Sequence, residues 1–368
     1  MFIWCFPIIF FLLVSHTVSV PILHHGRCKV NANIGYCQHR EICWESDVEL
    51  DSFSRSQCSS NTRKDLVCCR RQSQNISSTF HVSKSTNNEL IPQPGVCGGS
   101  PLNNRIYAGE KVHIQEFGWA ALLFYSYDDT EYTPMCGGSL INKRWILTAA
   151  HCVFHRHDGS VVNHIRARLG EWDTRSTPDC QEFLVGDRVC APPHIELNID
   201  LIKAHELYEH SNWINDIALL RLNRSVYYTD YVIPICLPPA KQTYADDYAG
   251  YAMDIVGWGK TAEAQFSGST IKMKASLDVI STPDCVRTHK KLFFGQMCAG
   301  GQTPQSTCKG DSGGALMLMN TSYSIPTYFA IGIISLGPQS CVGSRSPNIF
   351  TRVEFYMPWV MDTMHANS

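Results

Sequence analysis

Short apolar runs separated by turn residues fill the chain from residue 106 onward and determine the fold that we expect. Runs this short, bounded by glycine, proline and asparagine, are typical of β-strands, and their number favours antiparallel sheets closed into barrels. The sequence therefore predicts an all-β body over residues 106–368. The clearest runs lie at residues 119–125, 139–147, 217–222, 255–257 and 328–335.

The tail of the chain follows a different period. Its apolar residues recur close to helical spacing, which would place them on one face of a helix. We expect a C-terminal helix that docks on the body by this face. The residues are Val353, Tyr356, Met357, Val360, Met361 and Met364.

The N-terminal third contains no comparable series of strands. Residues 1–14 are apolar but too short to span a bilayer comfortably, and small polar residues follow them. We therefore expect residues 1–19 to be a signal peptide, with an uncleaved signal anchor as the alternative. Residues 70–94 are rich in Ser, Asn, Gln and Thr without hydrophobic periodicity, which is typical of a linker.

The cysteines indicate an oxidising compartment. Cys5 lies in the expected signal peptide, which leaves 16 of the 17, an even number typical of a disulfide framework in a secreted chain. Six of them crowd into residues 28–69, a segment too short to build a core, so three bridges would have to hold it. Spacing alone does not choose among their connectivities. Structural zinc is the alternative, but the chain lacks suitably paired cysteine and histidine sets.

The charge balance excludes some partners. The chain has 31 basic and 33 acidic residues, a net charge of −2, which indicates neither a nucleic acid nor an anionic membrane as partner. Three Asn-x-Ser/Thr sequons predict glycosylation at Asn75, Asn223 and Asn320.

Three motifs carry the candidate chemistry, in the order histidine, aspartate, serine. His151 stands in Leu-Thr-Ala-Ala-His-Cys, Asp216 in Asn-Asp-Ile-Ala-Leu-Leu and Ser312 in Gly-Asp-Ser-Gly-Gly. A serine hydroxyl is a poor nucleophile at neutral pH, so we expect His151 to accept its proton and Asp216 to orient the imidazole. The N–H groups of Gly310 and Ser312 are the expected oxyanion donors. Taken singly, a core histidine, a capping aspartate and a turn serine are the alternatives.

These motifs and their flanks resemble the chymotrypsin-like serine proteases. The Cys68-Cys69 doublet that closes the six-cysteine module, followed by a linker, resembles the arthropod clip-domain serine proteases in particular. The resemblance covers nearly all of the mature chain. It implies a clip domain at 28–69, a linker and activation region at 70–105, and a double antiparallel β-barrel with a C-terminal helix at 106–368.

The resemblance also implies a function. It implies a secreted serine endopeptidase zymogen in an extracellular cascade of immunity, melanisation or development. Its partners would be protein substrates, a trypsin-like activating protease and a serpin inhibitor, and catalysis would need no cofactor. A non-catalytic clip-domain binding protein and a digestive protease are the alternatives.

The same resemblance implies how the cysteines pair. All 16 are then used, with Cys97 tethering the light chain to the protease domain. The implied bridges are Cys28–Cys68, Cys37–Cys58, Cys43–Cys69, Cys97–Cys236, Cys136–Cys152, Cys180–Cys190, Cys285–Cys298 and Cys308–Cys341.

The segment around Arg105 looks like a zymogen cleavage site. We expect the cut after Arg105, so that the freed ammonium of Ile106 folds inward and pairs with Asp311. Ala108 stands where family members usually have glycine. An ordinary basic residue on a loop is the alternative.

The expected primary pocket departs from that of trypsin-like members. Ser306 stands six residues before the nucleophile, where those members have an aspartate that meets Arg or Lys. Gly337 is open, and Asn348 stands where glycine is common. A buried arginine without a carboxylate loses its charge partner, so we expect preference for an uncharged side chain, aromatic or apolar.

A structural calcium site is a further expectation. Residues 169–173 resemble the start of the calcium loop of related proteases, and carboxylate oxygens suit a hard cation. The candidate ligands are Glu171, Asp173 and Asp179. A solvated acidic loop is the alternative.

Overall fold

The chain divides into two compact units, Met1–His81 and Val82–Ser368. In the described part of the chain, no helix is long and apolar enough to cross a membrane. The expected signal peptide lies outside the described residues. The computed structural model describes residues 27–30, 33–39, 66–70, 90–99, 110–154, 159–183, 186, 188–240, 248–260, 268–302, 307, 310–338 and 346–368.

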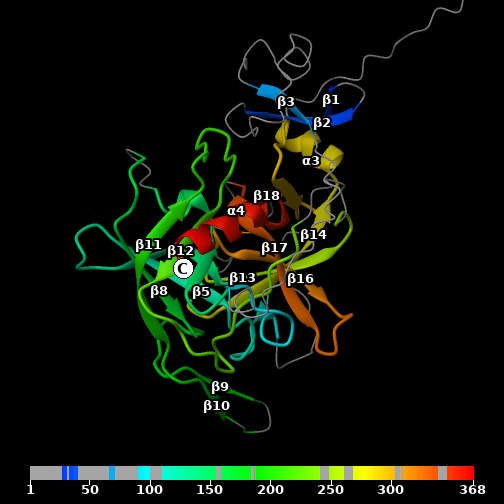
Figure 1. The fold of residues 1–368 in the computed structure, drawn as a ribbon. Coiled ribbons are helices and arrows are strands. Elements are labelled where there is room, and N and C mark those ends of the chain that lie inside the picture. Colours follow the sequence, from blue (N-terminus) through cyan, green and yellow to red (C-terminus); the bar gives the residue numbers. More distant parts are fainter. Residues whose placement is uncertain are drawn as a thin grey trace, which may run out of the picture. The chain divides into compact units, whose positions relative to one another are not determined.

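The first unit contains a small antiparallel sheet. Strands β1 (Arg27–Val30), β2 (Asn33–His39) and β3 (Leu66–Arg70) follow one another in the sheet (Figure 1). The register sets Cys37 opposite Cys68, so two cysteines of the expected clip domain lie on neighbouring strands. The side chains here lie outside the described part, and the three clip bridges stay predictions.

The second unit begins with a closed six-stranded barrel. Burial alternates along β8, so that one face of the strand points into the barrel. The apolar run predicted at 139–147 is two strands, because Asn142 Oδ1 accepts the N–H groups of Arg144 and Trp145 at 2.8 and 2.9 Å and turns the chain. The barrel order is β11 (Ile195–Ala204), β12 (Ala218–Leu222), β7 (Trp145–Thr148), β6 (Thr133–Leu140), β5 (Ala120–Ser126) and β8 (His164–Leu169).

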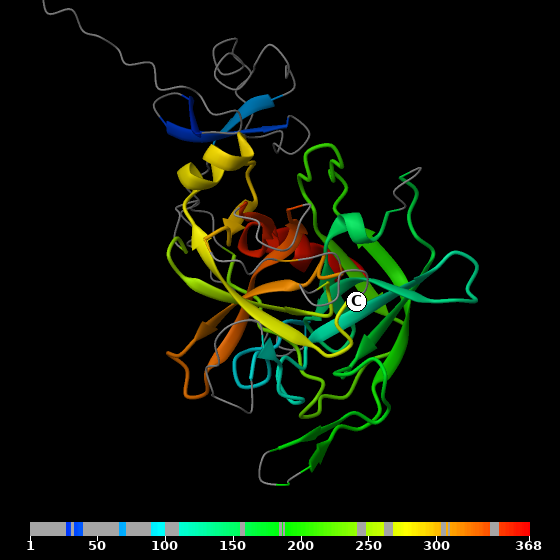
Figure 2. The same cartoon turned by 180° about the vertical axis from the view of Figure 1, so that it is seen from behind.

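A second barrel follows and lies beside the first in both Figure 1 and Figure 2. A pairing between β13 and β14 closes its sheet, and β4 (Glu110–Lys111) adds a short edge strand to β14. The order in this sheet is β13 (Ala252–Gly257), β16 (Ala315–Asn320), β17 (Thr327–Leu336), β18 (Asn348–Arg352), β15 (Gln296–Ala299) and β14 (Met273–Ile280).

Aromatic packing joins the two barrels. Phe117 and Trp119, which lead into β5, contact Tyr328 of β17 with ring centroids 5.3 and 5.6 Å apart. Trp119 also donates its indole N–H to Met317 Sδ at 3.1 Å. These large side chains are almost fully buried, so the interface between the barrels is part of the core.

Few helices and one hairpin complete the unit. Helix α4 (Val353–Ala366) buries the apolar face predicted for the tail, and η2 (Ala150–Cys152) is a single 3₁₀ turn. Helix α3 (Thr282–His289) begins at Ser281, whose Oγ accepts the N–H of Asp284. Strands β9 (Cys180–Glu182) and β10 (Arg188–Cys190) form a hairpin that projects at the bottom of Figure 2.

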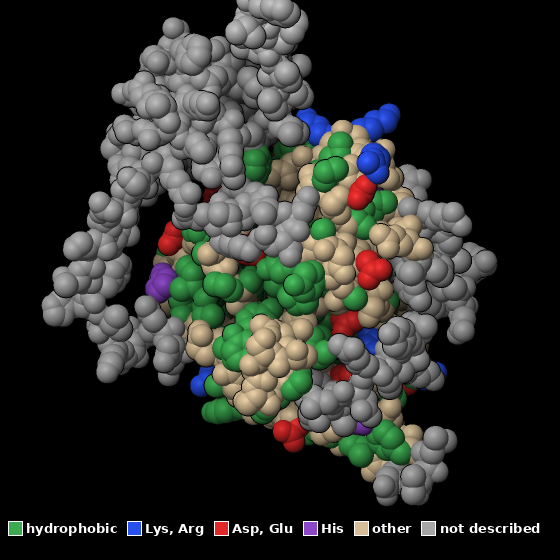
Figure 3. Space-filling view, turned by 90° about the vertical axis from the view of Figure 1, so that its right-hand side faces the viewer, with side chains coloured by type: hydrophobic (Ala, Val, Ile, Leu, Met, Phe, Trp, Pro, Cys, Tyr) green, Lys and Arg blue, Asp and Glu red, His purple; other side chains and the backbone are tan. Residues whose placement is uncertain are grey.

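The prediction of an all-β double barrel with a C-terminal helix is confirmed. On the face drawn in Figure 3, the acidic side chains of the described residues are scattered, whereas several basic side chains lie together at the top of the view.

Candidate active site

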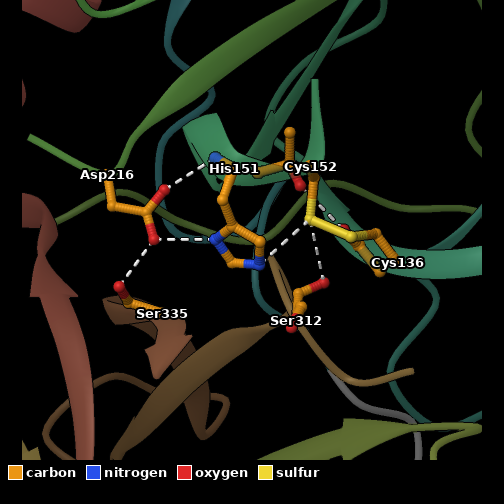
Figure 4. Close-up of a disulfide and its surroundings, with 8 residues drawn as sticks. Cys136, His151, Cys152, Asp216, Ser312 and Ser335 are labelled. Carbon is orange, nitrogen blue, oxygen red and sulfur yellow. Dashed lines mark hydrogen bonds and ion pairs between the residues drawn. A yellow bond between two sulfur atoms is a disulfide. The ribbon is translucent and has the colours of Figure 1, made fainter. Parts of the chain in front are cut away.

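The three candidate residues come from both barrels. His151 lies on η2, just after β7, and Asp216 lies just before β12 in the first barrel. Ser312 lies on the loop before β16 in the second barrel. Figure 4 places Asp216 on the Nδ1 side of the imidazole and Ser312 on the Nε2 side. The structure therefore brings the three predicted residues together at the seam between the barrels.

Asp216 holds His151 at two points. Its Oδ2 lies 2.8 Å from the ring Nδ1, and its Oδ1 accepts the backbone N–H of His151 at 2.8 Å. The carboxylate is fully buried, so each hydrogen bond offsets part of its desolvation. Such a clamp fixes the ring with Nδ1–H toward the carboxylate and leaves Nε2 to face the serine.

Two further hydroxyl groups fix Asp216, and the motif search did not identify either. Ser335 of β17 donates to Asp216 Oδ2 at 2.6 Å, and Thr351 of β18 donates to the Asp216 carbonyl at 2.7 Å. Both come from the second barrel. The seam between the barrels is thus crossed by hydrogen bonds at the aspartate itself.

Trp213 is a third neighbour that the sequence alone did not reveal. Its ring meets the His151 ring edge-on, with centroids 5.0 Å apart at 76°. Its backbone has φ +57°, and Gln296 Nε2 donates to its carbonyl at 3.0 Å. A non-glycine residue in the left-handed region is uncommon, and surrounding contacts have to hold it there. The indole forms an apolar wall beside the candidate base.

A disulfide fixes the base from the other side. Cys136 of β6 is bonded to Cys152 of η2, and Cys152 Sγ lies 3.7 Å from His151 Nε2. In the described part of the chain, Cys136, His151 and Cys152 are the sole group of three potential metal ligands close enough to share an ion. Because the two sulfurs are bonded to each other, they offer no thiolate to a metal.

The Ser312 loop is held by its backbone. The Ser312 carbonyl accepts the N–H of Gly137 at 2.7 Å, and Gly313 donates to the carbonyl of Ile334 at 2.9 Å. Gly313 has φ +82°, and a Cβ there would overlap Thr148 Oγ1. No hydrogen bond joins Ser312 Oγ to the imidazole among the described residues. Such contacts are often long without substrate and tighten when it binds.

The Asp311 carboxylate binds the backbone just after β13. Its Oδ1 accepts the N–H of Gly259 at 2.8 Å. A Cβ at Gly257 or Gly259 would overlap the same carboxylate, so glycine is required at both positions. The carboxylate therefore lies against the backbone that follows β13. Ile106, its predicted partner, and Arg105, the predicted cleavage residue, lie outside the described residues.

Three described residues converge where the primary pocket is expected. Thr307 Oγ1 donates to Asn348 Oδ1 at 2.7 Å, and Asn348 Nδ2 donates to the Ala299 carbonyl at 3.3 Å. A Cβ on Gly337 would lie 2.9 Å from Thr307 Oγ1 and 3.3 Å from Asn348 Oδ1. Asn348 is fully buried, and its side-chain amide forms hydrogen bonds with Thr307 and the Ala299 carbonyl. Ser306 lies outside the described residues.

Among the described residues the three expected calcium ligands do not gather into one site, although Glu171 and Asp179 both accept the N–H of Trp172, at 3.0 and 2.9 Å. Asp173 faces Arg175, with Oδ2 2.7 Å from the guanidinium. Asp179 accepts the N–H groups of Trp172 and Asp173 on Oδ2 and the hydroxyl of Ser176 on Oδ1. The carboxylate oxygens are taken by internal donors, and the residues present do not fit calcium, which takes 6–8 oxygen ligands.

Buried charges near this loop have shifted pKa values. Burial raises the pKa of Glu171 to about 7, although the Arg168 guanidinium opposes the rise. Burial also lowers the pKa of His194. Lys272 is almost fully buried, which lowers its pKa to about 8, and it donates to the Glu116 carbonyl at 2.8 Å.

Four of the implied disulfides are present: Cys97–Cys236, Cys136–Cys152, Cys180–Cys190 and Cys285–Cys298. Cys308 and Cys341 lie outside the described residues. Of the sequons, Asn223 is exposed and Asn320 is half-buried at the end of β16, while Asn75 lies outside the described part. Glycosylation stays a prediction.

Comparison with known proteins identifies the family. The trypsin family model matches residues 106–360. Serine protease ea of Drosophila melanogaster is 37% identical over 97% of this chain and 95% of its own length. The Spaetzle-processing enzyme of Drosophila melanogaster is 37% identical over 84% of this chain and 81% of its own length.

One solved structure and a further sequence relative agree. The crystal structure of the drosophila Grass clip serine protease of the Toll pathway superposes with a TM-score of 0.66 at 28% identity, and the match covers 94% of this chain and 99% of that one. The CLIP domain-containing serine protease B4 of Anopheles gambiae is 36% identical over 85% of this chain and 82% of its own length. The chain is thus a serine endopeptidase that belongs to the trypsin family and, within it, to the arthropod clip-domain serine proteases.

Proposed function

We propose that this chain is the secreted zymogen of a clip-domain endopeptidase that acts in an extracellular proteolytic cascade of immunity, melanisation or development. The observation that carries the proposal is the buried Asp216–His151 pair facing Ser312 across the barrel seam. The names of similar proteins support the cascade, since they include a Spaetzle-processing enzyme and a melanization protease of Drosophila melanogaster.

The geometry supports a two-step acyl transfer. Ser312 Oγ attacks the carbonyl carbon of the scissile bond while His151 Nε2 takes its proton. The N–H groups of Gly310 and Ser312 stabilise the oxyanion, and His151 then protonates the leaving amine as the C–N bond breaks. Water, deprotonated by the same nitrogen, releases the acyl group. Asp216 orients the ring throughout and stabilises its cation.

Activation follows a cut after Arg105 by a trypsin-like protease. The ammonium of Ile106 then pairs with Asp311 and orders the oxyanion loop. The position of the Asp311 carboxylate supports this role, because it lies next to backbone, at Gly259, that the new terminus can approach. The Cys97–Cys236 bridge would keep the light chain attached after the cut.

The primary pocket would accept an uncharged side chain. The side chains of Thr307 and Asn348 are hydrogen-bonded to each other, and neither carries a carboxylate that could pair with a basic substrate residue. With Ser306 in the position of the usual aspartate, arginine would be desolvated without a charge partner. Serpins that present an uncharged residue to this pocket would be the matching inhibitors.

A positional peptide-library profile of the protein cleaved after Arg105 tests this function. We expect cleavage after aromatic or medium-sized apolar residues, and Ser306→Asp should shift the preference toward Arg and Lys. Strong preference of the unmodified enzyme for Arg or Lys would overturn the pocket assignment. A fluorophosphonate that labels Ser312 after the cut supports the enzyme, whereas absence of labelling would favour a non-catalytic binding role.

A further inference from the structure

The loop in which calcium was expected contains an internal cation. Arg168 lies at the end of β8, and its guanidinium donates to Glu171 Oε2 at 2.9 Å through one terminal nitrogen. Its Nε donates to Glu196 Oε1 at 3.0 Å, and the second terminal nitrogen reaches the same oxygen. One guanidinium therefore bridges a fully buried carboxylate in the loop and a carboxylate on β11.

The sheet register explains why Arg168 lies beside Glu196. Arg168 and Glu196 are direct partners in the β8–β11 pairing, so they face each other as soon as the barrel forms. The guanidinium carbon also lies 4.4 Å from the centroid of the Phe124 ring on β5. The cation is thus held by the aromatic ring on one side and by carboxylates at its edges, with 16% of its side chain exposed.

A histidine faces the same acids. His194 Nδ1 lies 3.4 Å from Glu171 Oε2, and its Nε2 lies 3.9 Å from Glu196 Oε1. Both glutamates therefore have nitrogen partners from Arg168 and His194. A divalent ion placed at Glu171 Oε2 would lie beside the guanidinium, and like charges at that distance repel each other.

We propose that Arg168 replaces a metal ion as the structural cation of this loop, so that the protease domain holds residues 169–196 in place without calcium. The bridge that a divalent ion would make between a loop glutamate and the barrel is made here by a planar guanidinium. Five N–H donors in a fixed fork suit this bridging better than a lysine ammonium would.

The bridge supports more than the loop itself. Glu171 Oε1 accepts the N–H of Trp172 at 3.0 Å, and the Trp172 indole donates to the Val112 carbonyl at 2.7 Å. The Trp172 carbonyl accepts the indole N–H of Trp258 at 3.3 Å, one residue before Gly259, which contacts Asp311. Contacts therefore run from Arg168 to Val112, just after β4, and to the backbone beside Asp311.

Thermal unfolding of the full-length zymogen tests the proposal. We expect its Tm to change by less than about 1 °C between excess chelator and millimolar calcium chloride, the range in which extracellular calcium modules bind. Arg168→Gln should lower the Tm by roughly 5–10 °C, because it leaves buried Glu171 without its strongest partner. Calcium should then restore part of the loss, since the repelling charge is gone.

Arg175→Gln is the matched control. Arg175 lies in the same loop and pairs with Asp173, but 64% of its side chain is exposed, so its loss should lower the Tm by at most about 2 °C. The proposal fails if calcium raises the Tm of the unmodified zymogen by several degrees, or if Arg168→Gln behaves like Arg175→Gln. If Arg168→Gln is not secreted, terbium luminescence excited through Trp172 in the unmodified zymogen decides: no signal supports the proposal, and a saturable signal overturns it.

Discussion

The two sides of the active site are built in different ways. On the base side, His151 and Asp216 are fixed by hydrogen bonds from Ser335 and Thr351 and by the Cys136–Cys152 bridge. On the nucleophile side, glycine backbone holds Ser312, and Asp311 accepts the N–H of Gly259. The first side is complete as soon as the barrels fold, whereas the second depends on a carboxylate whose proposed partner arises by cleavage.

This difference suggests where a zymogen can be switched. The base side is buried, shared between two barrels and resistant to small movements. The nucleophile side can change its loop conformation without disturbing the core, because its contacts are main-chain hydrogen bonds and one carboxylate. We therefore expect variants on the base side to affect chemistry alone and variants on the nucleophile side to affect activation or stability as well.

The largest effect should come from Asp216→Asn. The amide cannot accept Nδ1–H as a carboxylate does, so the ring loses its tautomer, and in triads of this kind such a change lowers kcat by about 10⁴-fold. Steady-state hydrolysis of a peptide ester by the cleaved protein measures it. Asp200→Asn is the control, because Asp200 pairs with arginines at the surface. A loss below about tenfold would contradict the assignment of the triad.

Asp311→Asn should separate activation from chemistry. We expect normal cleavage after Arg105, seen as two disulfide-linked chains, but kcat/KM about 10²–10⁴-fold lower, since removing one partner of a buried ion pair costs about 3–5 kcal/mol. Kinetics of the cleaved protein and a reducing gel provide the measurements. Activity equal to that of the cleaved unmodified enzyme would show that Asp311 is not the acceptor of the new terminus.

Gly313→Ala should destabilise the nucleophile side. The added Cβ overlaps Thr148 Oγ1 in a loop that is held by its backbone, so we expect about 2–4 kcal/mol less stability in urea unfolding. Gly159→Ala is the matched control, since Gly159 also has positive φ, +69°, but an added Cβ there meets open space. Its cost should be about 1 kcal/mol. If both variants lose the same unfolding free energy, the loss at Gly313 comes from the positive φ and not from the overlap of the added Cβ with Thr148.

The smallest effect concerns pH. Lys272 of the linker into β14 is buried, and its pKa falls from 10.5 to about 8, so the unfolded chain binds this proton more tightly than the folded one. The unfolding free energy should therefore rise as pH increases from 8 toward 10.5, by about 3.5 kcal/mol at about 1.4 kcal/mol per pKa unit. Lys272→Met should remove this rise, while Lys291→Met, at an exposed position, should keep it.

Local patterns predicted most of the fold. The apolar runs located β5, β12, β13 and β17 to within a few residues, and the spacing from Val353 to Met364 located α4. These predictions succeeded because each depends on neighbours along the chain. The run at 139–147 hid a turn, since the side chain of Asn142 rather than glycine or proline makes it. Helix α3 was missed, although Ser281, Pro283 and Asp284 form a capping signal.

Contacts between distant segments limited how much of the site could be predicted from the sequence. The motifs located His151, Asp216 and Ser312, but Ser335 and Trp213 became visible only in the folded structure. Ser335 reaches Asp216 from the second barrel, and Trp213 reaches the His151 ring from the segment before β12. The acidic loop was interpreted from its carboxylates alone. Their partner Arg168 was just upstream in the sequence, but its role depends on the register that sets it opposite Glu196.

The bridge between Cys97 and Cys236 closes a covalent loop with a sequence separation of 139, and Arg105 lies inside it. A cut there opens the loop without releasing either end. Before the cut, ring closure restricts the unfolded chain and so favours the native state; afterwards the unfolded ensemble regains that freedom. The stability of the activated enzyme would then depend more on the ion pair made by its new terminus. The cut after Arg105 would therefore start catalysis and also shorten the lifetime of the folded state in any molecule that fails to form this pair.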